Sequence, residues 1–88
     1  MSDLTTYGLM AEKHWRQFRP RMVAELEAEG RLTAALREAE RQTFREMTRL
    51  TREFTRRNMT PQQAHDQAWE LIREKYILLP AEEAPPRD

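Results

Sequence analysis

The chain has 88 residues, enough for one domain at most, and 39% of them are apolar and 34% charged. Its fifteen basic and fifteen acidic side chains cancel, so the net charge by itself does not indicate a nucleic-acid binder. The absence of cysteine excludes disulfides and thiolate metal sites, and no apolar run approaches the roughly 18 residues that a membrane span needs. We therefore expect a cytoplasmic protein that does not contact membranes.

Two short helices are predicted at the start of the chain. Apolar side chains recur at helical spacing and predict a first helix that begins between residues 4 and 8 and ends at Phe18. Pro20 suits the first turn of a new helix, so a second helix is predicted from Pro20 to about Glu29. One helix kinked at Pro20 is the alternative. Gly30 is predicted to end this segment as a left-handed cap.

A long helix is predicted over about residues 31–57, because its apolar residues follow steps of four and three. We call these residues the apolar stripe: Leu32, Leu36, Ala39, Thr43, Met47, Leu50 and Phe54. The steps repeat after eleven residues, which favours a nearly straight or slightly right-handed packing seam, although Thr43 is an imperfect member. The stripe is longer than the first two helices can cover. It is therefore predicted to be the seam of a homodimer, formed by all its members except Thr43: Leu32, Leu36, Ala39, Met47, Leu50 and Phe54.

The opposite side of the long helix carries six arginines. We call them the arginine row: Arg37, Arg41, Arg45, Arg49, Arg52 and Arg56. From residue 31 to residue 57 there are eight arginines against four glutamates, so this segment is basic although the chain is neutral. Such a row could follow a phosphate backbone. The alternative is a solvated face on which charges pair locally, through Glu38–Arg41, Glu46–Arg49 and Glu53–Arg57.

The sequence Thr60-Pro61-Gln62-Gln63 predicts the start of a fourth helix. Thr60 is a good N-cap, Pro61 suits the first helical position, and Gln63 completes a capping box. We expect this helix to end at Lys75 or Tyr76 and the apolar segment 77–79 to pack back onto the helices or dock on a partner. Residues 80–88 are predicted to be a disordered, acidic, proline-rich tail, so the single helical domain spans residues 1–79.

No group of residues predicts catalysis, a cofactor or a metal site. The two histidines, His14 and His65, lie on different predicted helices, and neither has a partner at a familiar ligand spacing. His14 falls on an apolar helix face, which indicates a half-buried histidine that donates one hydrogen bond. The only glycines are Gly8 and Gly30, which excludes a glycine-rich phosphate loop. We expect a non-enzymatic protein without a cofactor.

Short motifs follow one another at a fixed spacing in the first half of the chain: Tyr7-Gly8-x-Met10, then Arg19-Pro20 ten residues after Leu9, then Leu26, Gly30-x-Leu32, Leu36 and Glu38. Together they resemble the transposon-encoded TnpV-like family over about residues 7–47. These are small helical proteins carried on bacterial mobile elements. The resemblance implies a mobile-element context and implies no catalytic residues.

The sequence thus predicts an all-α fold, a small bundle of about four helices with one long central helix, for which coiled-coil-like packing is an option. We expect the long helix to pack antiparallel against the first two helices and the fourth helix to close the core. The predicted function is a non-enzymatic interaction or regulatory protein of a mobile element that acts as a homodimer, with a further protein partner left open. A DNA- or RNA-binding accessory protein that uses the arginine row is the alternative. A helix–turn–helix reader that turns at Gly30 is a third interpretation, although its recognition helix would be unusually long.

Overall fold

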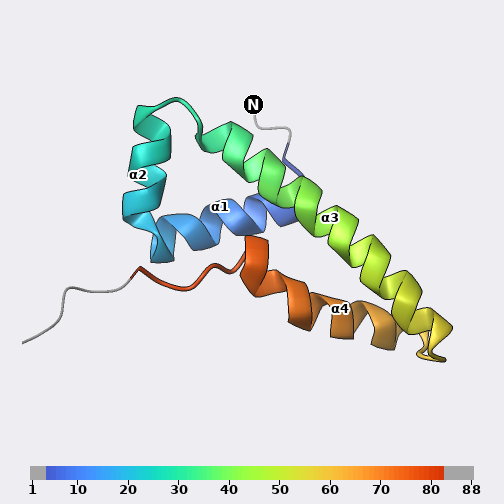
Figure 1. Cartoon of the computed structure of the whole chain (residues 1–88). Coiled ribbons are helices and arrows are strands. Elements are labelled where there is room, and N and C mark those ends of the chain that lie inside the picture. Colours follow the sequence, from blue (N-terminus) through green and yellow to red (C-terminus); the bar gives the residue numbers. More distant parts are fainter. Residues whose placement is uncertain (1–3, 83–88) are drawn as a thin grey trace, which may run out of the picture.

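The computed structural model describes residues 4–82, and over that range the chain forms four α-helices and no strand (Figure 1). The helices are α1 (Thr6–Phe18), α2 (Pro20–Ala28), α3 (Leu32–Arg56) and α4 (Pro61–Tyr76). The predicted all-α bundle with one long helix is confirmed. In Figure 1, α3 forms the longest side of the molecule, α2 and α4 turn back from its two ends, and α1 starts beside the middle of α3.

Local sequence signals explain where the helices end. Arg19 has φ −131° and ψ 51°, so α1 and α2 are two helices and not one kinked helix. Gly30 has φ 67°, and its N–H donates to the Glu27 carbonyl at 3.0 Å, as in a Schellman cap. Asn58, with φ 70°, ends α3 in the same way. At the start of α4, Thr60 and Gln63 form the predicted capping box.

The apolar stripe is buried within a single chain. Its first half packs against α1 and α2 in one cluster, and its second half packs against α4 in another. All stripe residues other than Leu50 are at most 9% exposed, and Leu50 is partly buried. The prediction that the stripe needs a second chain to cover it is therefore wrong, because α4 of the same chain covers the part that α1 and α2 do not reach. Three aromatic residues contact both clusters and join them into one core: Tyr7, Trp69 and Tyr76.

The segment that follows α4 packs back onto α1, the first of the two predicted alternatives. Ile77 is fully buried, and its carbonyl accepts a hydrogen bond from the Trp15 indole at 3.1 Å. His14 donates from Nε2 to the Leu79 carbonyl at 2.8 Å, which confirms the prediction of a half-buried histidine with one hydrogen bond. Arg19 donates to the Pro80 carbonyl at 3.1 Å. Specific contacts thus continue past residue 79, and residues 83–88 of the predicted tail lie outside the described residues.

The N-terminus of α2 is capped by a residue from the far end of the chain. The two carboxylate oxygens of Glu82 accept hydrogen bonds from the backbone N–H groups of Arg21 at 3.1 Å and Met22 at 2.8 Å. The Glu82 N–H in turn donates to the Phe18 carbonyl at 2.9 Å. Because α2 has no cap from its own N-cap side chain, Glu82 takes that role and ties the C-terminal segment to the α1–α2 junction.

Candidate nucleic-acid interface

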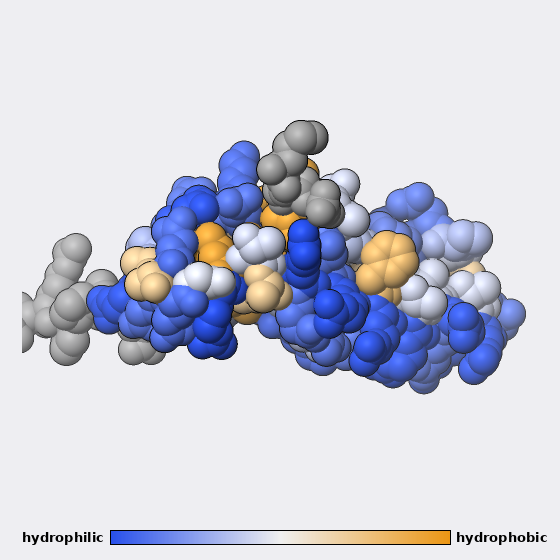
Figure 2. All heavy atoms as spheres, turned by 90° about the horizontal axis from the view of Figure 1, so that it is seen from above, coloured by the Kyte–Doolittle hydropathy of each residue, from blue (hydrophilic) through white to orange (hydrophobic). Residues whose placement is uncertain are grey.

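The arginine row lies on the outer side of α3. The 3.6-residue period of the helix directs the apolar stripe into the core, so side chains on the opposite side face the solvent. All six arginines of the row are exposed. Figure 2 looks at the molecule from above and shows a largely hydrophilic surface interrupted by small apolar areas. The structure therefore brings the predicted nucleic-acid contacts together on one face.

Part of this basic charge is paired locally, as the alternative interpretation predicted. Arg49 lies 2.8 Å from Glu46, Arg57 lies 2.9 Å from Glu53, and Arg41 pairs with Glu38. The more exposed pairs, Arg41–Glu38 and Arg57–Glu53, contribute only about 0–1 kcal/mol each and hold their side chains weakly. Three other members of the row make no ion pair within residues 4–82: Arg45, Arg52 and Arg56. These three arginines are available for an external anion.

Phe44 is an exposed aromatic side chain beside this row. It is 62% exposed, although phenylalanine is one of the residue types most often buried in proteins. Its ring meets Tyr7 in a T-shaped contact at 6.3 Å, and Tyr7 stacks on Trp69 at 5.6 Å. Phe44 is thus the outer end of an aromatic series drawn from three helices. The sequence analysis missed Phe44 as a site residue, although it lies outside the apolar stripe and next to Arg45.

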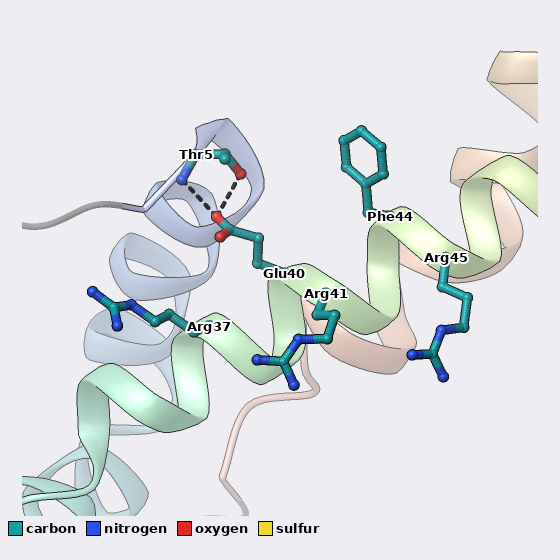
Figure 3. A pocket seen from close by; sticks show the side chains of 6 residues that line it. All are labelled: Thr5, Arg37, Glu40, Arg41, Phe44 and Arg45. Carbon is teal, nitrogen blue, oxygen red and sulfur yellow. Dashed lines mark hydrogen bonds between the residues drawn. The ribbon is translucent and has the colours of Figure 1, made fainter.

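Two grooves adjoin Phe44. The first, which we call the basic groove, has a volume of about 590 Å³ and is lined by Thr5, Arg37, Glu40, Arg41, Phe44 and Arg45. Figure 3 shows Phe44 projecting from one margin of this groove and Arg41 and Arg45 from the other. The second, which we call the apolar groove, has a volume of about 380 Å³ and is lined by Tyr7, Phe44, Met47, Thr48, Thr51, Arg52 and His65. An aromatic ring therefore separates a cationic surface from a mainly apolar one.

Among residues 4–82, Glu40 is the acid that lines the basic groove, and its carboxylate is hydrogen-bonded within the protein. It accepts hydrogen bonds from the backbone N–H groups of Thr5 at 2.6 Å and Gly8 at 3.2 Å, and from the Thr5 hydroxyl (Figure 3). Desolvation raises the pKa of Glu40, but these hydrogen bonds and the charge of Arg37 outweigh it and keep the pKa below its ordinary value. Glu40 therefore stays ionised at neutral pH, as a negative charge in a groove that arginines also line.

The part of the chain that the structure describes holds no group of three metal-ligating side chains and no helix long and apolar enough to cross a membrane. Comparison of the chain with protein-family models, curated proteins and solved structures finds no match. The case for a function therefore rests on the geometry around α3.

Proposed function

We propose that this chain is a non-enzymatic nucleic-acid-binding accessory protein that uses the arginine-rich face of α3. The observation that carries the proposal is that three exposed arginines of the α3 row form no ion pair within residues 4–82: Arg45, Arg52 and Arg56. Arginine forms forked hydrogen bonds to phosphate, and a row of arginines on one helix face can contact successive phosphates. Its association with a bacterial mobile element is part of the proposal and rests on the resemblance of residues 7–47 to the TnpV-like family.

The burial of the apolar stripe reverses the preference between the two functions that the sequence left open, a homodimeric interaction protein and a nucleic-acid-binding protein. The homodimer was favoured because the stripe needed a partner, and α4 of the same chain now provides one. The arginine row, by contrast, keeps three members without an ion pair inside the described range. A polyanion satisfies those charges directly, so nucleic-acid binding becomes the better supported function.

The proposal is tested by a salt titration of binding to labelled duplex and single-stranded oligonucleotides. We expect binding at low salt that weakens as salt rises, with a log–log slope near −0.9 per phosphate contacted on duplex and −0.7 on single strands. A triple variant, Arg45→Gln with Arg52→Gln and Arg56→Gln, is expected to flatten the duplex slope by about 2.7 if each arginine contacts one phosphate.

A matched triple variant controls for the change in net charge. Lys13→Gln, Arg16→Gln and Arg21→Gln remove the same charge from exposed positions of α1 and α2 and leave α3 unchanged. We expect this control to bind nearly as the native chain does, and circular dichroism to show both variants folded. Equal weakening by the two triples, or no binding of either oligonucleotide at low salt, would contradict the proposal.

A homodimer remains a second candidate because the molecule is flat. Its Cα atoms extend over 48 × 41 Å but only 14 Å in the third direction, which leaves two broad faces. Large apolar side chains are exposed on the surface of the molecule, among them Leu9 at 52% and Leu71 at 57%. Light scattering coupled to gel filtration tests this candidate: a dimer should dissociate in Leu71→Glu or Leu9→Glu, whereas a native chain that elutes as a monomer at micromolar concentration rules it out.

A further inference from the structure

We infer that the nucleic acid bound by this surface is single-stranded, with one base stacked on Phe44 in the apolar groove and the adjoining phosphates held by Arg45 and Arg52. This inference rests on the proposed function and adds the class of nucleic acid and the residue that recognises it. Its basis is the position of an open aromatic ring between two grooves of different chemistry.

The Phe44 ring has area left for a ligand. Its exposed fraction is 62%, and its one aromatic contact, with Tyr7, is edge-on at an interplanar angle of 74° and not a stack. Stacking on a base adds apolar contact that the fold itself does not provide, and every base has a face that can stack on an aromatic ring. Tyr7 in turn stacks on Trp69 at 5.6 Å, so the ring that contacts Phe44 is itself packed against a second aromatic side chain.

The apolar groove has the size and lining of a site for a base. Its volume of about 380 Å³ lies in the range of about 300–1,000 Å³ that small-molecule sites occupy. Met47 and Tyr7 contribute apolar side chains to its lining, and Thr48 and Thr51 contribute small polar ones. Arg52 lines the same groove, so a base bound there places its phosphate within reach of a guanidinium group.

These features favour a single strand over a duplex. In a duplex the base faces are already stacked on one another, and opening one step costs a few kcal/mol. In a single strand the faces are free, and combining an aromatic platform with a cationic groove is the general way in which proteins bind it. A duplex would use the arginine row alone and leave Phe44 and the apolar groove unused.

The experiment compares four probes by fluorescence anisotropy: an oligothymidylate, an abasic strand of equal length, the corresponding duplex and polyglutamate. The abasic strand keeps the phosphates and lacks the bases, so it separates stacking from charge. We expect the native chain to bind the oligothymidylate most tightly. Phe44→Ala should weaken that binding roughly 5- to 150-fold, the range that one base–aromatic stack represents, and leave the abasic strand unaffected. Phe44→Trp, which keeps an aromatic ring at this position, should bind the oligothymidylate about as tightly as the native chain does.

Two controls make the result specific. Leu71→Ala removes an apolar side chain that is similarly exposed, at 57%, from α4, and should change no affinity. The double variant Arg45→Gln with Arg52→Gln should weaken both single strands and flatten their salt dependence, because it removes phosphate contacts and not the stack. Circular dichroism of Phe44→Ala checks that the fold is retained, which its exposure leads us to expect.

The outcomes separate the two proposals. If the duplex binds as tightly as the oligothymidylate, or if Phe44→Ala has no effect, the single-strand inference is overturned while nucleic-acid binding by the arginines stands. If polyglutamate binds more tightly than any oligonucleotide, the surface recognises an acidic protein segment and both proposals are wrong. If no probe binds at low salt, both proposals fail as well.

Discussion

The carboxylate of Glu40, on α3, caps the start of α1 and lies directly against Gly8. One oxygen, Glu40 Oε2, accepts from the Gly8 N–H at 3.2 Å and from the Thr5 N–H at 2.6 Å. A Cβ atom on residue 8 would lie 2.6 Å from that oxygen and 2.9 Å from Leu4 Cβ. Only glycine therefore lets α1 approach α3 this closely. The contact positions Tyr7, and through Tyr7 the aromatic series that ends at Phe44.

Gly8→Ala is expected to destabilise the protein. Alanine gains about 1 kcal/mol in a helix relative to glycine, but overpacking costs about 1–3 kcal/mol and displacement of Glu40 loses a cap of about 1 kcal/mol. The net loss should be about 1 kcal/mol or more, measured by urea unfolding. Part of this cost should disappear in a Glu40→Ala background, because the carboxylate is then absent. A stabilising Gly8→Ala would show that α1 does not approach α3 in this way.

Stability is expected to fall on acidification because of Glu40 and Glu82. Desolvation raises the pKa of each carboxyl. Hydrogen bonds from backbone N–H groups at the start of α1 or α2, together with nearby arginines, lower the pKa by more than that, so the net pKa lies below its ordinary value. A carboxyl whose pKa is lowered by folding stabilises the protein at a pH above the pKa of the unfolded chain, about 4.3. That stabilisation is lost as the pH falls through the pKa of the folded chain.

Melting temperatures measured between about pH 6 and pH 3 check this expectation, since that interval spans the ordinary carboxyl range. The double variant Glu40→Gln with Glu82→Gln should melt at a lower temperature at neutral pH and show a flatter pH dependence. Glu25→Gln, at an exposed position of α2, is the control and should follow the native curve. A double variant with the native pH dependence would rule out these two caps as its source.

Thr43→Val is expected to stabilise the protein by about 1 kcal/mol. Thr43 is fully buried, and its hydroxyl oxygen has no hydrogen-bond partner among the described residues. Valine has a similar shape and a similar helix propensity but no polar atom to desolvate. Thermal unfolding measures the change, and Thr48→Val, at an exposed position of the same helix, should have little effect. Destabilisation by Thr43→Val would mean that the hydroxyl has a partner.

Thr60→Ala is expected to destabilise the protein by about 1 kcal/mol. The Thr60 hydroxyl accepts from the Gln63 N–H at 3.2 Å, and the Gln63 side chain accepts from the Thr60 N–H at 3.1 Å. Losing the cap should loosen the first turn of α4, which covers the second half of the apolar stripe. Gln67→Ala, an exposed substitution in the same helix, serves as the control. An unchanged melting temperature for Thr60→Ala would show that this turn does not contribute to stability.

The helix boundaries and the two faces of α3 were predictable from the sequence alone. They depend on interactions within one or two turns of the chain: Pro20 at the start of α2, the left-handed Gly30 after it, and the Thr60–Gln63 capping box. The local pairing of Arg41, Arg49 and Arg57 with nearby glutamates was predictable for the same reason, since residues three or four apart are neighbours on a helix.

The tertiary structure alone decided which surfaces are covered and which remain open. Covering the apolar stripe required α4 to fold back along α3. The caps of α1 and α2 are the carboxylates of Glu40 and Glu82, which accept hydrogen bonds from N–H groups 32 and 60 positions earlier in the chain. The contact of Phe44 with Tyr7, near the start of α1, likewise depends on how α1 packs against α3. Sequence periodicity shows which face of a helix is apolar, but which neighbour buries that face depends on the packing of distant segments.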